Sequence, residues 1–254
     1  MIRNLFNIEE SVFLLKRKFE EIKKRGWIKK TTPNTGEAGL RLENLLNKDN
    51  NNLSFPDFEG IEVKTKKESK FNNYITLFNC TPYGKDFFEI KRIVKNFGYP
   101  DKNLKNCKIL NGDVFANSKN KIGSNYYFQL KIDMNSQLIN LLIFNRNGVL
   151  IDNSAYWDFK MLKQKLYCKI HYLAIIKVNS MKIEKREYYR YSDIKIYELK
   201  SFEDFLKQIE TGNIKVSFGV GLYKKGNRLG QLHDRGTKFR INIDLIEQLY
   251  NLIS

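Results

Sequence analysis

Asp57, Glu62 and Lys64 lie close together in the stretch NNLSFPDFEGIEVKT, which runs from residue 51 to 65. Glu62 and Lys64 are two residues apart, so a β-strand would direct both side chains to one face. Asp57 precedes a bend and can come alongside them from the neighbouring segment. Two carboxylates suit Mg²⁺ when waters and a phosphate complete its shell, and a nearby lysine can orient the attacking water. The pattern predicts metal-dependent hydrolysis of a phosphodiester.

The residues around these three side chains predict a β-hairpin that holds them together. Hydrophobic positions alternate with charged ones on both sides of Glu59-Gly60, which indicates two short extended segments that meet at a bend. The alternative is a surface hairpin with solvated charges, because Pro-Asp followed by Glu-x-Lys is common by chance. A preceding helix, expected from Glu37 or Leu40 to Leu46, carries Glu43 off its leucine stripe, so Glu43 could face the same cleft.

The rest of the chain predicts helices and strands in mixed order, which favours an α/β or α+β fold. An amphipathic helix is expected from Asn7 to Arg25, and an apolar strand from Tyr74 to Phe78 should extend the sheet of the hairpin. Periodicity and capping residues predict further helices over residues 87–96, 157–166 and 201–208 and from 244 onward, and strands over 125–132, 137–144, 149–151, 172–178, 187–191, 214–223 and 238–243.

The chain of 254 residues is strongly basic, with 45 Lys and Arg against 28 Asp and Glu and a formal net charge of +17. This surplus favours a polyanionic partner, above all nucleic acid, although a basic surface can also serve solubility alone. A membrane surface is the competing partner. The sequence offers no basic amphipathic helix with a clean apolar face and no apolar run that would span a bilayer, so we expect no membrane association.

The cysteines and the N-terminus indicate a cytoplasmic protein. Cys80, Cys107 and Cys168 are odd in number and widely spaced, which is typical of reduced thiols and not of a zinc site or disulfide framework. The first residues lack the apolar core of a signal peptide, and none is expected.

Three stretches in order, NTGEAGLRLENLL, SFPDFEGIEVKT and YITLF, resemble the opening of the type II restriction endonucleases of the MvaI and BcnI type, bacterial relatives of the mismatch-repair nickase MutH. The resemblance continues through IDNSAYWDF and GTKFRIN and so covers most of the chain. It implies a PD-(D/E)XK nuclease core and a DNA-recognition lobe, which we expect in residues 1–150 and 151–254. It also implies Mg²⁺, for which Mn²⁺ should substitute, and a monomer that cuts double-stranded DNA.

The resemblance assigns a role to each candidate active-site residue. It matches Asp57 and Glu62 to the metal-binding acids of the family and Lys64 to its catalytic lysine. Glu43 matches a glutamate, on the helix before the hairpin, that assists at the active site. The residue pattern and the resemblance therefore select the same hairpin.

A basic, glycine-rich segment between Tyr223 and Arg240 is the candidate for reading DNA bases. It contains Arg228 and the triplet His233-Asp234-Arg235. Arginine can bind guanine through two hydrogen bonds, histidine can donate to the same acceptors, and aspartate can accept from the cytosine amino group. The triplet therefore suits a G·C-rich site, whereas the alternative interpretation is a solvated basic hairpin.

The resemblance implies base-reading groups at Tyr223, His233, Asp234 and Arg240 and a target in which CC and GG flank a central pair. The sequence also departs from its relatives. Ser217 and Gly219 stand where relatives carry charged side chains, and Arg235 stands where they have a second histidine. We therefore expect a related but not identical target.

Two other functions fit the same residues. A MutH-like repair nickase would wait for a partner protein and a hemimethylated site, whereas a restriction enzyme makes double-strand breaks in unmodified DNA on its own. A non-catalytic DNA-binding module would bind DNA without cleaving it in Mg²⁺ or Mn²⁺, and its acidic-lysine cluster would be structural.

Overall fold

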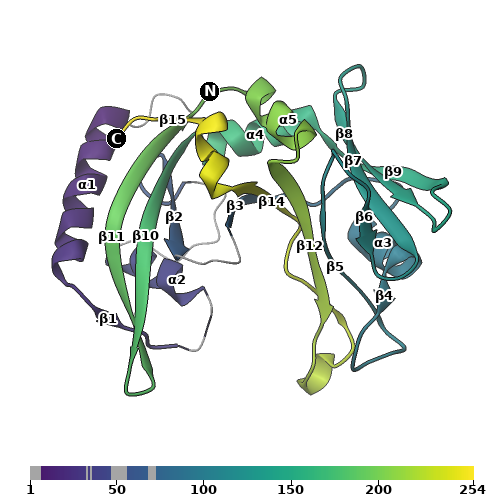
Figure 1. Cartoon of the computed structure of the whole chain (residues 1–254), viewed down its shortest axis with the longest axis horizontal. Helices are drawn as coiled ribbons and strands as arrows, with labels where there is room; N and C mark the ends of the chain where they lie inside the picture. The colour runs from purple at the N-terminus through teal and green to yellow at the C-terminus, as the bar shows by residue number, and fades with distance from the viewer. Residues whose placement is uncertain (1–6, 33, 35, 47–55, 68–72) are drawn as a thin grey trace. The chain divides into compact units, whose positions relative to one another are not determined.

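The computed structural model describes residues 7–32, 34, 36–46, 56–67 and 73–254 (Figure 1). The chain splits into two compact units. The first unit comprises Met1–Ile75, Gln164–Lys200 and Glu247–Ser254, and the second comprises Thr76–Lys163 and Ser201–Ile246. The expected division at residue 150 is therefore not where the units separate. Each unit combines early and late segments because strands that are far apart in the sequence pair with each other.

The sheet of the first unit has the order β1-β11-β10-β2, and β15 pairs with β11. These strands are β1 (Ile28–Lys29), β2 (Ile61–Lys67), β10 (Tyr172–Ile183), β11 (Arg186–Leu199) and β15 (Tyr250–Leu252). β10 and β11 form a long antiparallel hairpin, whereas β10 and β2 run parallel. Parallel strands need a long crossover. Here the crossover runs through the second unit, which is why no single cut separates the two.

Two helices of the first unit pack with its sheet. α1 (Ile8–Lys24) packs against β11, and α2 (Glu37–Leu45) packs against β2. Asn7 caps α1 by accepting the Glu9 N–H at 3.2 Å, and basic residues occupy its last turn, as helix termini favour. The apolar faces of α1 and α2 pack with the sheet in one buried cluster, which includes Leu15, Phe19, Leu42, Ile61, Val63, Ala174, Ile176 and Tyr191. The predicted amphipathic helices are confirmed.

The second unit contains two sheets. One has the order β3-β14-β12-β5-β4, with β13 paired to β12, and the other has the order β6-β7-β8-β9. The strands are β3 (Tyr74–Asn79), β4 (Tyr99–Pro100), β5 (Lys108–Val114), β6 (Asn120–Ile122), β7 (Tyr126–Asp133), β8 (Leu138–Phe144), β9 (Leu150–Asp158), β12 (Ile214–Leu222), β13 (Leu232–Asp234) and β14 (Lys238–Asn242). The mixture of sheets and helices confirms the predicted α+β class.

Three α-helices and two short 3₁₀ helices complete the described chain: α3 (Glu89–Phe97), α4 (Phe159–Lys169), α5 (Phe202–Glu210), η1 (Gly226–Arg228) and η2 (Ile243–Gln248). Ser201 caps α5 as predicted, because its Oγ accepts the Asp204 N–H at 2.9 Å. None of the helices in the described ranges has the length and apolar character that a membrane crossing requires.

Two of the predicted elements were wrong in detail. The strand predicted from Tyr74 to Phe78 exists as β3, but it pairs with β14 in the second unit and does not extend the sheet of β2. The helix predicted from Asp244 is only the short η2, and the chain then returns as β15 beside β11. In both cases the partner strand lies far away in the sequence, so local periodicity carries no information about it.

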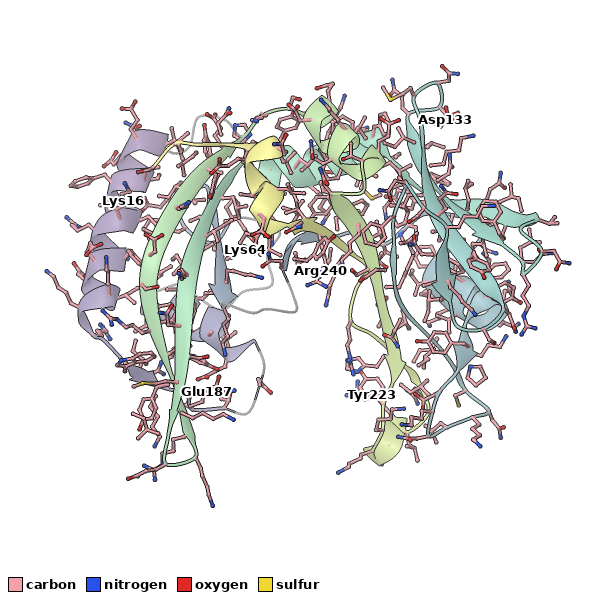
Figure 2. All side chains as sticks on the ribbon, viewed as in Figure 1. Lys16, Lys64, Asp133, Glu187, Tyr223 and Arg240 are labelled. Carbon is pink, nitrogen blue, oxygen red and sulfur yellow. The ribbon has the colours of Figure 1, made fainter. Side chains whose placement is uncertain are left out.

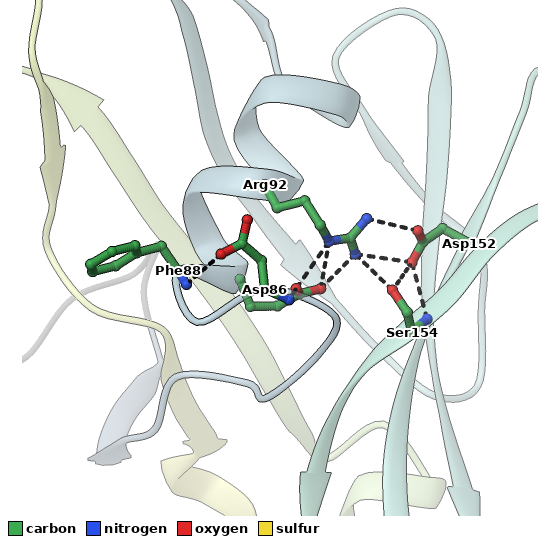
Figure 3. A network of polar contacts seen from close by, with 6 residues as sticks. Asp86, Phe88, Arg92, Asp152 and Ser154 are labelled. Carbon is green, nitrogen blue, oxygen red and sulfur yellow. Dashed lines mark hydrogen bonds and ion pairs between the residues drawn. The ribbon is translucent and has the colours of Figure 1, made fainter.

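A buried ion network fixes α3 to β9 (Figure 3). Arg92 Nη1 donates to Asp152 Oδ2 at 2.8 Å, and Arg92 Nε donates to both oxygens of the nearly fully buried Glu89 at 3.0 Å. Burial acts to raise the pKa of Asp152, but hydrogen bonds from Arg92 and Ser154 outweigh it, so this pKa is lowered. At Gly84 a side chain would overlap the Glu89 carboxylate. The network therefore also anchors the loop that leads into α3.

Candidate active site and nucleic-acid interface

A two-residue turn at Glu59-Gly60 brings Asp57 beside β2. The Phe58 N–H donates to the Ile61 carbonyl at 2.9 Å, and the Ile61 N–H donates back at 2.7 Å. Glu59 and Gly60 have φ angles of 40° and 87°, and positive values at both central residues are typical of a type I′ hairpin turn. The predicted bend is confirmed. Most of the first predicted extended segment lies outside the described residues.

β2 separates its charged side chains from its apolar ones, as the alternation predicts. Ile61 and Val63 belong to the apolar core. Glu62 and Lys64 project together to the other face, where Lys64 Nζ lies 2.5 Å from Glu62 Oε1 (Lys64 is labelled in Figure 2). The Glu62 side chain is only 3% exposed, whereas that of Lys64 is 25% exposed. The lysine is thus the member of the pair that a substrate can reach.

Asp57 is held against the same strand through the backbone. Its Oδ2 accepts the Val63 N–H at 3.0 Å. Since Val63 lies between Glu62 and Lys64 in the sequence, this bond fixes the Asp57 carboxylate alongside both. The structure therefore brings together all three residues that the sequence predicted at the hairpin.

Glu62 is in an unusual electrostatic position for a carboxylate. Burial raises the pKa of Glu62, the charge of Asp57 raises it further, and the ammonium groups of Lys64 and Lys169 act in the opposite direction. Its Oε2 is buried and has no hydrogen-bond partner among the residues that the structure describes. A buried carboxylate oxygen without a partner costs desolvation free energy, and a bound cation would compensate that cost.

The carboxylates fit a hard divalent cation. In the described part of the chain, no group of three or more His, Cys, Asp or Glu residues is arranged to hold a metal ion. Mg²⁺, however, commonly takes only one or two carboxylates from the protein and completes its octahedron with waters and substrate phosphate. Asp57 and Glu62, with the buried Oε2, provide such a partial donor set.

Lys169 is a residue of this site that the sequence interpretation missed. It is the last residue of α4, and its Nζ lies 3.8 Å from Glu62 Oε1. β10 begins shortly afterwards and pairs in parallel with β2, with Leu173 opposite Glu62. Only this non-local pairing brings the end of α4 to the hairpin, so no short motif could have revealed Lys169.

Glu43 lies on α2 within the same unit as the hairpin residues. Its side chain is half-buried and takes part in a polar interaction within the structure. α2 approaches β2 closely, since a Cβ at Gly39 would contact Thr65 Oγ1 at 3.4 Å. This packing keeps Glu43 on an element adjacent to the active-site strand, and its assisting role stays a prediction.

Most of the predicted base-reading residues lie on or beside the hairpin of β12 and β13, and all of them lie in the second unit. The rings of Tyr223 and His233 stack with centroids 4.4 Å apart and an interplanar angle of 11°. The Arg228 guanidinium lies 4.0 Å from the Tyr223 ring centroid and donates to its hydroxyl at 3.0 Å (Tyr223 is labelled in Figure 2). The three side chains therefore form one stack, and their contacts with each other fix their orientation. Periodicity of the sequence did not predict this arrangement.

Two of the remaining predicted reading residues, Asp234 and Arg235, lie beside glycines of this region. Asp234 Oδ1 accepts the Gly236 N–H at 2.7 Å, so one of its oxygens stabilises the turn. Arg235 lies over β12, because a Cβ at Gly219 would meet the Arg235 side chain at 3.6 Å. This is an ordinary van der Waals distance, so Arg235 and Gly219 are neighbours. Arg240 lies on β14 opposite Lys215.

Asp113 on β5 is a second residue that the sequence interpretation missed. Its Oδ2 lies 2.6 Å from the buried Lys215 Nζ, and its Oδ1 accepts the Ser217 hydroxyl at 2.5 Å. Burial acts to raise the pKa of Asp113, but the bonds from Lys215 and Ser217 and the charge of Arg240 outweigh it and lower this pKa. Ser217 is thus bonded to a carboxylate from the neighbouring strand.

Comparisons with known proteins agree with this architecture. The model of the MvaI/BcnI restriction endonuclease family matches residues 16–250. Among solved structures, the restriction endonuclease MvaI in complex with its cognate DNA substrate is 31% identical, with a TM-score of 0.88 over 96% of this chain and 99% of that one. MvaI in the absence of DNA is also 31% identical, with a TM-score of 0.60 over 96% of each chain. The search of curated proteins gave no match. The chain belongs to the MvaI/BcnI restriction endonuclease family.

Proposed function

We propose that this restriction endonuclease uses Mg²⁺ to hydrolyse phosphodiester bonds of double-stranded DNA at a short CC-N-GG-like sequence. Its family makes the chain a site-specific DNA endonuclease and therefore a hydrolase. The observation that carries the finer proposal is the hairpin site on β2. There two carboxylates meet, one of them with a buried oxygen that has no described partner, and Lys64 Nζ lies 2.5 Å from that same carboxylate.

In the proposed mechanism, Asp57 and Glu62 hold the metal ion, and Lys64 acts on the attacking water or on the phosphate. The ion, when bound, supplies positive charge that polarises the phosphoryl group and acidifies water. Lys64 orients the attacking water or offsets the charge that develops on the phosphate in the transition state. Glu43 supports the site from α2. The apolar core behind Ile61 and Val63 keeps the strand rigid, so the charged groups need little reorganisation.

We assign catalysis to the first unit and base reading to the second. Arg240 is the proposed guanine contact, and the stack of Arg228, Tyr223 and His233 offers further donors and an aromatic face. Asp234 and Arg235 are the other two proposed base-reading residues. Similarity to MvaI, which was solved with its cognate DNA substrate, supports DNA as the ligand of this chain. The surplus of +17 supplies phosphate contacts that strengthen binding without selecting a sequence.

The exact target differs from that of its relatives in this proposal. Ser217 and Gly219 replace charged side chains, while Asp113 and Arg235 occupy the space beside them.

The enzyme acts as a monomer, which carries one catalytic set and cuts one strand and then the other. A stable dimer on DNA, measured by light scattering, would contradict this part.

Digestion of a DNA of known sequence, followed by mapping of the fragment ends, tests the proposal. With Mg²⁺ we expect discrete double-strand breaks at CC-N-GG-like sites, and with excess EDTA we expect intact DNA. Mn²⁺ should substitute for Mg²⁺. Nicks confined to hemimethylated DNA would instead indicate a MutH-like enzyme, and binding without any cleavage would indicate a non-catalytic module.

A further inference from the structure

Lys169 places a second ammonium group at the proposed active site. We propose that Lys169 is a further catalytic residue that contacts the phosphate undergoing cleavage; this inference rests on the proposed function of the hairpin site. The residue lies in the first unit with Glu62, although most of the second unit separates the two in sequence. Its Nζ lies 3.8 Å from Glu62 Oε1, the same oxygen that Lys64 approaches to 2.5 Å.

The backbone that carries Lys169 is fixed at the site. The next residue, Ile170, is fully buried, and its N–H closes the last turn of α4 by donating to the Leu166 carbonyl at 3.1 Å. The carbonyl of Ile170 accepts the hydroxyl of the buried Tyr250 at 3.1 Å. β10 then continues in register beside β2. The end of α4 is therefore held on both sides, which fixes the backbone from which the Lys169 side chain reaches Glu62.

The distances leave Lys169 with binding capacity. A separation of 3.8 Å exceeds the usual N–H···O length of about 3.2 Å at most, so this contact is an ion pair and not a hydrogen bond. The two ammonium groups have six N–H donors between them, whereas the single Glu62 oxygen that both approach has two lone pairs, so Lys169 keeps donors for another acceptor. The Lys169 side chain is 26% exposed, so an anionic ligand can reach it. A phosphate oxygen is the ligand that fits beside the metal-binding acids.

A purely structural role for Lys169 explains these features less well. Lys64 already provides the close counter-charge of Glu62. A longer pair with a partly exposed lysine adds little to stability, because solvent screens it. A second cation at a phosphoryl-transfer site, in contrast, offsets charge that grows in the transition state.

The test compares Lys169→Met and Lys169→Arg with Lys160→Met, which removes one exposed positive charge from the first turn of the same helix. Single-turnover cleavage is measured with Mg²⁺, and affinity for the same DNA is measured with Ca²⁺. We expect Lys169→Met to slow cleavage by about 10- to 100-fold while affinity changes by less than about threefold. Lys169→Arg should recover at least part of the rate, and Lys160→Met should leave both quantities unchanged. Thermal unfolding confirms that each variant is folded at the assay temperature.

Three results would overturn the inference. In the first, Lys169→Met cleaves at the wild-type rate. In the second, the DNA affinity of Lys169→Met falls by as large a factor as its cleavage rate, as expected for a contact that is equally strong in the bound ground state and in the transition state. In the third, folded Lys169→Arg is no faster than Lys169→Met. A wild-type chain that cleaves no DNA would instead refute the proposed function, so the two failures are distinguishable.

Discussion

Glu62 and Lys64 share one face of β2, with the Lys64 ammonium 2.5 Å from Glu62 Oε1, while the other oxygen of that carboxylate is buried without a described partner. One oxygen is thus neutralised by the protein and the other is available to a cation. Asp57 faces the same place because its carboxylate is bonded to the strand between them.

Replacement of Asp57 by Asn should abolish cleavage and spare DNA binding. The amide keeps the shape of the side chain but removes one of the two negative charges that hold the metal ion. Because the lost charge supports the transition state, we expect single-turnover cleavage to fall by at least about 100-fold. Glu59→Gln, which removes an exposed carboxylate from the same turn, is the matched control and should cleave at the wild-type rate. Wild-type cleavage by Asp57→Asn would refute the assigned role.

Glu62→Gln should stabilise the metal-free protein at neutral pH. The pKa of Glu62 is raised by burial, so the folded state favours the protonated form and loses stability as pH rises from the ordinary value of 4.5 through the raised pKa. Removal of the charge should therefore raise Tm by roughly 2–4 °C, which corresponds to about 1 kcal/mol for a chain of this size. The gain should shrink as pH falls toward 4.5.

Thermal unfolding with added Mg²⁺ completes that test. A ligand that binds the folded state raises its stability, so Mg²⁺ should raise the Tm of the wild type and leave that of Glu62→Gln unchanged. An equal Mg²⁺ response in both proteins would show that the ion binds elsewhere.

Replacement of Asp113 by Asn should weaken the second unit in a pH-dependent way. Lys215 is buried, and it loses its charged partner together with the strong bond at 2.6 Å. Because the Asp113 side chain is itself 42% exposed and solvent screens the pair, we expect a destabilisation of only about 0.5–1 kcal/mol near pH 7. Since the pKa of Asp113 is lowered in the folded state, this contribution is present above the unfolded pKa of about 3.8 and is lost as pH falls below it.

Urea unfolding of the wild type and Asp113→Asn at pH 7 and pH 3 measures this effect. The difference in unfolding free energy between the two proteins should be smaller at pH 3. Glu210→Gln, which changes an exposed carboxylate of the same unit, should be nearly neutral by comparison. A difference that grows toward acid pH would contradict the proposed pairing.

Arg240→Ala should reduce sequence discrimination more than general DNA affinity. Loss of a bidentate guanine contact costs about 1–3 kcal/mol at one base pair and relaxes the preference there. Cleavage of a CC-N-GG duplex and of duplexes changed at each G·C pair provides the measurement. Lys225→Ala, which removes an exposed cation, should instead weaken all duplexes alike and flatten the salt dependence of binding. An unchanged rate on the CC-N-GG duplex would count against Arg240.

The sequence by itself determined the hairpin and its chemistry. Asp57, Glu62 and Lys64 fall within one short stretch, and the alternation of a strand fixes which of its side chains share a face. Gly60 marks the bend, because glycine adopts a positive φ without strain, whereas the positive φ of Glu59 does not follow from its residue type. The capping of α5 and the amphipathic face of α1 were predictable for the same reason, since these interactions act over a few residues.

Only the tertiary structure decided which distant segments meet. The parallel pairing of β2 with β10 brings Lys169 to Glu62, and the pairing of β5 with β12 places Asp113 beside Ser217. It also decided that β3 joins β14 and that the last segment returns as β15. These contacts join residues that are far apart in the chain. The partner of each strand is selected by the burial of a shared apolar core, because the local periodicity of a strand is compatible with many alternative partner strands.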